Sequence, residues 1–216
     1  AKAMQDCGRH VGAMLAVGLD EEKAADLIAR HDPSASIAAF NGPSSLTIAG
    51  LRTSLEPMAA ELEASGVFNR FVRVQHPFHH ALMQPAAEFL EASLAGLEPR
   101  EGSVPFFSTV TGALCPGTDC TPAYWARGIR QPVRFLSAVQ SMASHGVDVW
   151  LEISAHPALA VSIQECLAAA GLKAPVVSST RREREQGAAM DAALELHRLG
   201  VALDFKGITP SRRILV

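Results

Sequence analysis

The chain has 216 residues, 48% of them hydrophobic, and a formal net charge of −3 from 19 basic and 22 acidic side chains. A chain of this length and apolar content can bury a sizeable core. The near balance of charges gives no electrostatic argument for nucleic acid or an anionic membrane as a partner. No apolar run approaches the roughly 18 residues of a membrane-spanning helix, and the N-terminus lacks the pattern of a secretory signal.

The first third of the chain has a strand and helix order of its own. Its predicted elements are a strand over 11–19, a helix over 20–31, strands over 36–40 and 45–50, a helix over 54–65 and a strand over 68–75. The acidic residues Glu21 and Glu22 favour the start of the first helix, where the helix dipole stabilises negative charge. Asn41 lies in a turn by composition, between the two middle strands. The resulting βαββαβ order is that of a ferredoxin-like unit.

The rest of the chain alternates helices with apolar strands. Its predicted helices cover 81–97, 121–130, 133–144, 157–170 and 184–199, and its predicted strands cover 105–111, 147–153 and 175–179. Such alternation is typical of a parallel sheet covered by helices, so we expect an α/β layer. The 4 cysteines follow neither a CxxC nor a zinc spacing, and we expect reduced thiols.

Three histidines, His76, His79 and His80, fall within five positions at the junction of the two parts. Histidine is the usual general base because its pKa lies near physiological pH. A metal site would need two of these rings on one helical face and a further ligand, but Pro77 disfavours a regular helix and no acidic residue is close in sequence. From spacing alone, a general base, a metal ligand and a structural role all stay open.

The segment over 76–83, HPFHHALM, resembles the HAFHSPLM segment of acyltransferase domains in modular type I polyketide synthases. Further segments are similar to that family in the same order along the chain, and they cover 12–19, 41–50, 107–112, 124–127, 131–135, 152–157 and 181–205. Each segment is short, but the set is collinear over nearly the whole chain. The chain is therefore identified as a member of that family, with malonyl-CoA:acyl carrier protein transacylase as the related activity.

The resemblance implies an α/β acyltransferase fold with two subdomains. One is a partial large subdomain with a parallel, α/β-hydrolase-like sheet, and the other is a ferredoxin-like βαββαβ small subdomain. We expect the end of a large-subdomain helix over 1–10, the small subdomain over 11–75, the remainder of the large subdomain over 76–200 and the start of a post-acyltransferase linker over 201–216.

By that resemblance His79 is the catalytic histidine, which takes the proton of a serine hydroxyl that attacks the thioester of an acyl-CoA. The family orients this ring with a backbone carbonyl, commonly from an Asn or Gln, and the corresponding position here is Gly128. His76 and Phe78 occupy positions that track the choice of acyl unit, and Asn41 matches an asparagine that faces the active site. The resemblance implies no metal site.

The resemblance also implies a preference for one acyl unit, through the size of the side chain at position 78. A phenylalanine beside the catalytic histidine fills the space that a larger α-substituent would need, so Phe78 favours malonyl over methylmalonyl. Pro77 replaces the more usual alanine, which leaves other acyl units open. A methyl group in a pocket is worth only about 1–3 kcal/mol, so the steric argument is modest.

The serine nucleophile of the family lies in a Gly-His-Ser-x-Gly elbow, and no such motif occurs in this chain. The arginine that pairs with the malonyl carboxylate in the family would precede Ala1. We therefore expect an N-terminally incomplete domain that carries the base and part of the pocket. This segment alone is predicted to transfer no acyl group.

The resemblance implies no bound cofactor. Its substrates are malonyl-CoA or a related acyl-CoA and the phosphopantetheine thiol of an acyl carrier protein, with neighbouring ketosynthase and other synthase domains as partners, in the cytoplasm. Two other function classes stay open. One is a non-catalytic, degenerate acyltransferase-fold module that binds a carrier protein. The other is a small-molecule regulatory module built on the ferredoxin-like unit, which leaves the histidine cluster unexplained.

Overall fold

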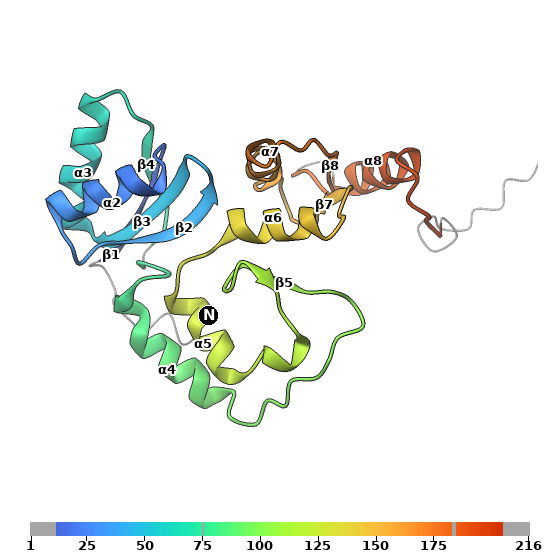
Figure 1. Ribbon diagram of the computed structural model, residues 1–216, viewed down its shortest axis with the longest axis horizontal. Coiled ribbons are helices and arrows are strands. Elements are labelled where there is room, and N and C mark those ends of the chain that lie inside the picture. The colour runs from blue at the N-terminus through green and yellow to red at the C-terminus, as the bar shows by residue number, and fades with distance from the viewer. Residues whose placement is uncertain (1–11, 75, 183–184, 205–216) are drawn as a thin grey trace, which may run out of the picture.

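The computed structural model of the chain describes residues 12–74, 76–182 and 185–204. Its strand-rich first part is an antiparallel four-stranded sheet in the order β2-β3-β1-β4. The strands are β1 (Gly12–Val17), β2 (Ser36–Gly42), β3 (Ser45–Leu51) and β4 (Asn69–Phe71). Helices α2 (Glu21–His31) and α3 (Arg52–Ala64) cover one face of this sheet (Figure 1). This arrangement confirms the predicted ferredoxin-like unit.

The helix-covered face of that sheet holds the main apolar core. Side chains alternate across a strand, so every second residue of β1 points toward the helices. The fully buried side chains that meet there are Leu15, Leu27, Ile48, Leu55 and Met58. Helix α2 begins at the predicted place because the Asp20 carboxylate accepts a hydrogen bond from the backbone N–H of Lys23 at 2.9 Å.

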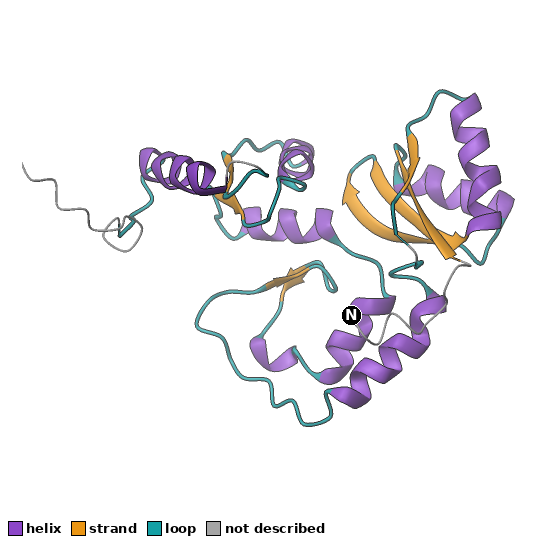
Figure 2. Cartoon of the chain, turned by 180° about the vertical axis from the view of Figure 1, so that it is seen from behind, coloured by secondary structure: helices purple, strands orange, loops and turns teal. Residues whose placement is uncertain are grey.

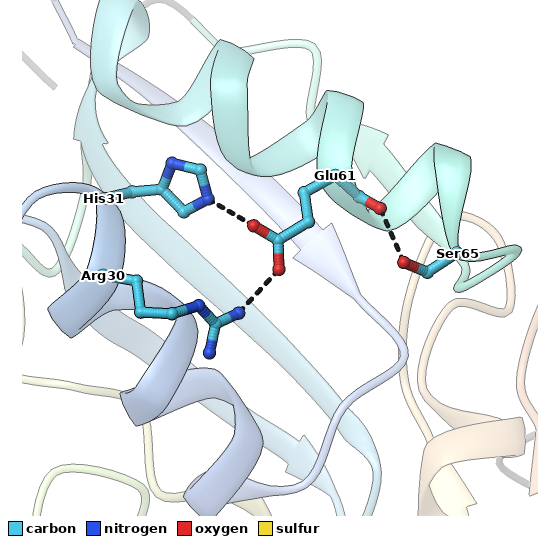
Figure 3. A network of polar contacts seen from close by, with 4 residues as sticks. All are labelled: Arg30, His31, Glu61 and Ser65. Carbon is cyan, nitrogen blue, oxygen red and sulfur yellow. Dashed lines mark hydrogen bonds and ion pairs between the residues drawn. The ribbon is translucent and has the colours of Figure 1, made fainter.

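A polar cluster on the surface joins the two helices of the ferredoxin-like unit (Figure 3). Glu61 of α3 lies 2.6 Å from both His31 and Arg30 at the end of α2. Hydrogen bonds from His31 and Arg30 hold the pKa of the Glu61 carboxyl below its usual value. Ser65 ends α3 by donating its hydroxyl to the Glu61 carbonyl at 2.9 Å. These exposed contacts hold the ends of α2 and α3 together.

The second part of the chain contains the remaining helices and four short strands. The helices are η1 (Ala81–Met83), α4 (Gln84–Ser93), η2 (Gly117–Asp119), α5 (Pro122–Arg130), α6 (Phe135–Ser144), α7 (Ala160–Ala169) and α8 (Glu185–Arg198), and the strands are β5 (Phe107–Ser108), β6 (Ala113–Leu114), β7 (Trp150–Glu152) and β8 (Val176–Ser178). Strands β7 and β8 pair in parallel, as expected of an α/β layer. Helices α4 and α5 lie side by side in both views (Figures 1 and 2).

Strand pairing connects the two parts of the molecule. The backbone N–H of Val133 donates to the carbonyl of Ala38, and the N–H of Phe40 donates to the carbonyl of Val133, each at 2.8 Å. These bonds form a parallel bridge on the outer edge of β2. Helix α6 follows directly and packs against β2. The edge of the ferredoxin-like sheet is thus paired by the segment that leads from α5 to α6.

Several predicted elements are shorter than expected or paired differently. The prediction of a buried strand over 105–111 is wrong, because only β5 forms there and it pairs antiparallel with β6. Gly112, with a φ of 75°, makes the turn between them, and its N–H donates to the Ser108 carbonyl at 2.7 Å. The helix predicted over 157–170 begins only at Ala160.

The predicted subdomain boundaries are not tested by these elements, and they stay predictions. Residues 1–10 and 205–216 lie outside the part of the chain that the structure describes. Cys115, Cys120 and Cys166 are free thiols. Within the described ranges, no helix has both the length and the apolar composition needed to cross a bilayer.

Candidate active site

His79 has an unusual backbone conformation. Its φ of 60° makes it the one non-glycine residue with a positive φ among the residues described. L-residues rarely adopt this left-handed region, which persists only where neighbouring contacts over-determine it. One such contact is the backbone N–H of His79, which donates to the carbonyl of Ile129 at 3.0 Å. The end of α5 therefore holds the backbone of the predicted catalytic residue.

The same helix end also holds the His79 ring. Nδ1 lies 3.0 Å from the backbone carbonyl oxygen of Gln131. A carbonyl oxygen only accepts, so Nδ1 carries the proton and the neutral ring keeps a lone pair on Nε2. Burial lowers the pKa of His79 from its ordinary value, and the carbonyls of Gln131 and Gly128 offset part of that effect. A lowered pKa keeps the ring neutral near pH 7, so that Nε2 is available to accept a proton.

The carbonyl that bonds to the ring was not singled out in the sequence. The orienting role was expected at Gly128, and Gly128 influences the pKa of the ring, but the hydrogen bond at 3.0 Å comes from Gln131. Carbonyls in the last turn of a helix have no intrahelical partner, so several of them point past the end of α5 toward His79. A usable signal was present, because Gln131 has one of the implied residue types and precedes the helix-ending Pro132. The role of Gly128 stays a prediction.

Helix α5 is held in place at its first turn. Thr121 caps it by accepting a hydrogen bond from the N–H of Tyr124 at 3.2 Å, and Pro122 follows at the first helical position. The buried hydroxyl of Tyr124 lies 2.7 Å from the hydroxyl of Ser108 on β5. Ser108 also accepts the N–H of Val110 at 3.0 Å. A helix anchored in this way presents its C-terminal carbonyls in a defined position.

Phe78 directly precedes His79 in the chain, and its side chain packs against two apolar clusters. It packs against the cluster around Met83 at the start of α4. It also packs against Met14, Ala38 and Ala49 on the face of the ferredoxin-like sheet that α2 and α3 leave uncovered. Phe78 therefore contacts both parts of the molecule, and its role in selectivity stays a prediction.

The residues before Phe78 are packed tightly. The ring centroids of His76 and Phe78 lie 5.7 Å apart. Nδ1 of His76 is buried and has no hydrogen-bond partner among the described residues. Pro77 is fully buried against Gly12, where a Cβ would overlap the proline ring. Glycine at position 12 thus makes room for the proline that replaces the expected alanine.

Asn41 belongs to β2 and not to the turn that its composition suggested. Its side-chain amide donates to the hydroxyl of Thr47 at 3.2 Å, and its backbone carbonyl accepts the thiol of Cys166 at 3.4 Å. These bonds tie Asn41 to β3 and α7. An active-site role for Asn41 stays a prediction.

The site as described offers one ring nitrogen that can accept a proton. Nε2 of His79 is the basic atom, and the bond from Nδ1 to Gln131 fixes the direction of the ring. Among the described residues, no group of three His, Cys, Asp and Glu side chains could hold a metal ion.

Comparison with known proteins identifies the family. The family described as acyl transferase domain matches residues 2–203. The chain belongs to the acyltransferase domain family. A spectinabilin polyketide synthase protein from Streptomyces orinoci, NorC, is 37% identical over 204 residues, which are 94% of this chain and 9% of that protein. Polyketide synthase GfsB from Streptomyces halstedii is also 37% identical, over 94% of this chain and 4% of its own length.

The fold of this acyltransferase domain agrees with solved relatives. The acyltransferase domain from module 8 of the salinomycin polyketide synthase superposes with a TM-score of 0.87 at 32% identity. That match covers 95% of this chain and 48% of the solved chain. The chain therefore has the acyltransferase fold but spans less than a tenth of the two curated relatives and about half of the solved domain.

Proposed function

We propose that this acyltransferase domain moves an acyl unit from coenzyme A to the phosphopantetheine thiol of an acyl carrier protein, with His79 as general base. The observation that carries the proposal is the His79 ring, bonded through Nδ1 to the Gln131 carbonyl at 3.0 Å with Nε2 left basic. A histidine in this arrangement needs only a hydroxyl within reach to activate a nucleophile. The serine is expected outside this chain, since the chain has no Gly-His-Ser-x-Gly motif.

His79 accepts one proton and gives it back in each half of the proposed reaction. In the first half, the serine oxygen attacks the thioester carbon and its proton passes to Nε2. The carbon–sulfur bond then breaks, and the proton moves to the departing coenzyme A sulfur. In the second half, the carrier thiol gives its proton to Nε2 as its sulfur attacks the acyl ester, and the proton returns to the serine oxygen as that carbon–oxygen bond breaks.

The carbonyls at the end of α5 support the charged form of His79 that exists between these steps. The C-terminus of a helix carries a partial negative charge. The carbonyl of Gln131 accepts from Nδ1, and the influence of Gly128 on the ring has the same sign. These carbonyls would stabilise the positively charged imidazolium and orient its ring, as an aspartate does in a protease triad.

The proposed acyl unit is malonyl. Phe78 packs beside His79 against both parts of the molecule, so it has little freedom to move away from an α-substituent. His76, which contacts Phe78, and Asn41 are proposed to shape the same pocket. We propose that the domain acts in the cytoplasm, with a carrier protein and neighbouring synthase domains as partners.

The test is the intact mass of a complete acyltransferase domain containing this chain after incubation with malonyl-CoA, methylmalonyl-CoA or acetyl-CoA. We expect a malonyl adduct that is largely absent in His79→Ala. The matched control is His145→Ala, because His145 is an exposed histidine whose ring contacts the Ser141 carbonyl at 2.8 Å and the Phe107 ring in an edge-to-face arrangement, and not His79. A folded wild-type domain that takes up none of the three acyl groups would refute the proposal and favour a non-catalytic carrier-binding module.

A further inference from the structure

His80, the residue after the catalytic histidine, is the more deeply buried of the two. It is 6% exposed and uses both ring nitrogens. Nδ1 accepts the backbone N–H of Leu82 at 3.1 Å, and Nε2 lies 2.7 Å from the backbone carbonyl oxygen of Ser34. The first bond caps the short helix η1. The second reaches a residue 46 positions away in the ferredoxin-like unit.

These two contacts define the proton position on His80. Nδ1 faces an N–H donor and must be the acceptor, whereas Nε2 faces a carbonyl and must be the donor. These contacts therefore place the His80 proton on Nε2. His79 has the opposite arrangement, with its proton on Nδ1. Two adjacent histidines thus have fixed and opposite tautomers, each set by a backbone carbonyl from a different part of the fold.

The acceptor on the ferredoxin-like side is itself held in place. Ser34 lies in the loop between α2 and β2, and its N–H donates to the Asp32 carboxylate at 2.8 Å. The Ser54 hydroxyl of α3 donates to the same carboxylate. Because of these bonds, the carbonyl that His80 reaches is a firm anchor and not a mobile loop.

We propose that His80 is a positioning residue that holds His79 in its left-handed conformation by tying the backbone directly after His79 to the ferredoxin-like unit. On one side, the carbonyls of Ile129 and Gln131 at the end of α5 accept hydrogen bonds from the backbone N–H and Nδ1 of His79. The bond from His80 to Ser34 fixes the other side. A positive φ at a non-glycine residue relaxes unless contacts on both sides prevent it. Without the His80 anchor, the His79 ring turns away from Gln131 and Nε2 leaves its working position.

Two substitutions separate the two contacts of His80. In His80→Asn, the short amide can still accept the N–H of Leu82, but it cannot reach Ser34. In His80→Gln, the longer amide can still donate to the Ser34 carbonyl, but it loses the cap on η1. The matched control is His145→Asn, at an exposed histidine outside the site.

The first readout does not depend on acyl transfer. In a complete acyltransferase domain labelled with ¹⁵N-histidine, the imidazole spectrum reports the tautomer of each ring. We expect the Nδ1–H form of His79 in the wild type, in His80→Gln and in His145→Asn, and a mixture of tautomers in His80→Asn. An unchanged His79 tautomer in His80→Asn would overturn the inference.

The second readout rests on the proposed function. We expect the rate of malonyl adduct formation to fall at least about tenfold in His80→Asn and to stay within about threefold of wild type in His80→Gln, since misplacement of a catalytic group by about 1 Å can cost about a hundredfold. If the rate of adduct formation falls equally in both variants, together with their melting temperatures, the role of His80 is merely structural and the proposal is contradicted. If the wild type forms no adduct, the proposed function fails while the imidazole spectra still decide the role of His80.

Discussion

The two neighbouring histidines show how strongly the backbone decides side-chain chemistry. His79 and His80 have the same side chain and differ by one position, yet one keeps a basic Nε2 and the other uses both nitrogens in structural bonds. The His79 ring, on a left-handed backbone, bonds to the Gln131 carbonyl at the end of α5, whereas the His80 ring bonds to the Ser34 carbonyl of the ferredoxin-like unit. Only the first arrangement leaves an atom free to accept a substrate-derived proton.

The pH dependence of acyl uptake tests the environment of His79. In the proposed mechanism neutral His79 accepts the serine proton, and burial lowers the pKa of His79 from the ordinary value of 6.5. The neutral form therefore persists to lower pH than in a free histidine. We expect the acid limb of kcat/KM for malonyl uptake to have a midpoint below 6.5. Rates measured across the acid and neutral range check this. A midpoint at or above the ordinary histidine value would contradict it, and the His145→Asn control should keep the wild-type profile.

At the scale of elements, helix α7 was predicted to begin at residue 157 but begins at Ala160. The reason is the Glu152 carboxylate, which binds the backbone N–H groups before and at the helix start. The Glu152 carboxylate at the end of β7 is 5% exposed. It accepts hydrogen bonds at 2.8 to 3.1 Å from the backbone N–H groups of Ala158, Leu159 and Ala160, and from the hydroxyl of Ser154 at 3.0 Å. These N–H groups are the ones that a helix start leaves without intrahelical partners. One buried carboxylate therefore fixes both the start of α7 and its position on β7.

Glu152→Gln should destabilise the domain by about 1–3 kcal/mol, because an amide cannot satisfy the same set of donors. Burial by itself would raise the pKa of Glu152, but its hydrogen bonds hold the pKa below the usual glutamate value. The stabilisation is therefore complete above the ordinary glutamate range and is lost as the pH falls through the lowered value. Urea unfolding of the complete domain at neutral and acid pH measures both effects.

The matched control for this prediction is Glu165→Gln, at an exposed position on α7. It should leave the free energy of unfolding nearly unchanged at neutral pH. If Glu152→Gln were as stable as this control, the carboxylate would not be the cap that holds α7.

At the scale of the whole molecule, the second part of the chain exposes apolar surface. Ile153, directly after β7, is 82% exposed, and Leu151 within the strand is 42% exposed. A cavity of about 510 Å³ lies beside Gly128 and Ile129 at the end of α5, with Phe106 and Trp125 also in its wall. Such surfaces are typical of places where further protein packs.

We expect the 216-residue chain, purified alone, to transfer no acyl group from malonyl-CoA, since its sequence contains no Gly-His-Ser-x-Gly nucleophile motif. Intact mass before and after incubation with malonyl-CoA and a carrier protein measures this. The complete domain under the same conditions is the positive control. Malonyl transfer by the isolated chain would contradict the expectation and would require a nucleophile within these residues.

Much of the architecture was determined by the sequence alone. The βαββαβ order of the ferredoxin-like unit, the positions of α2, α5, α6 and α8, and the strands that became β7 and β8 follow from apolar periodicity and helix start and stop signals, which act over a few residues. The histidine-rich segment and its family resemblance also come from local sequence. The pairing of the strands could not be predicted from the sequence in the same way. An example is β5, which pairs antiparallel with β6 through the turn at Gly112.

Only the tertiary structure decided which atoms meet at the candidate site. The Gln131 carbonyl at the His79 ring lies 52 positions away in sequence, and the Ser34 carbonyl at the His80 ring lies 46 positions away. Backbone carbonyls carry no residue identity, so no sequence pattern distinguishes one carbonyl from another. Which carbonyl is used depends on where α5 ends and how the ferredoxin-like unit docks, and both are set by packing between distant segments.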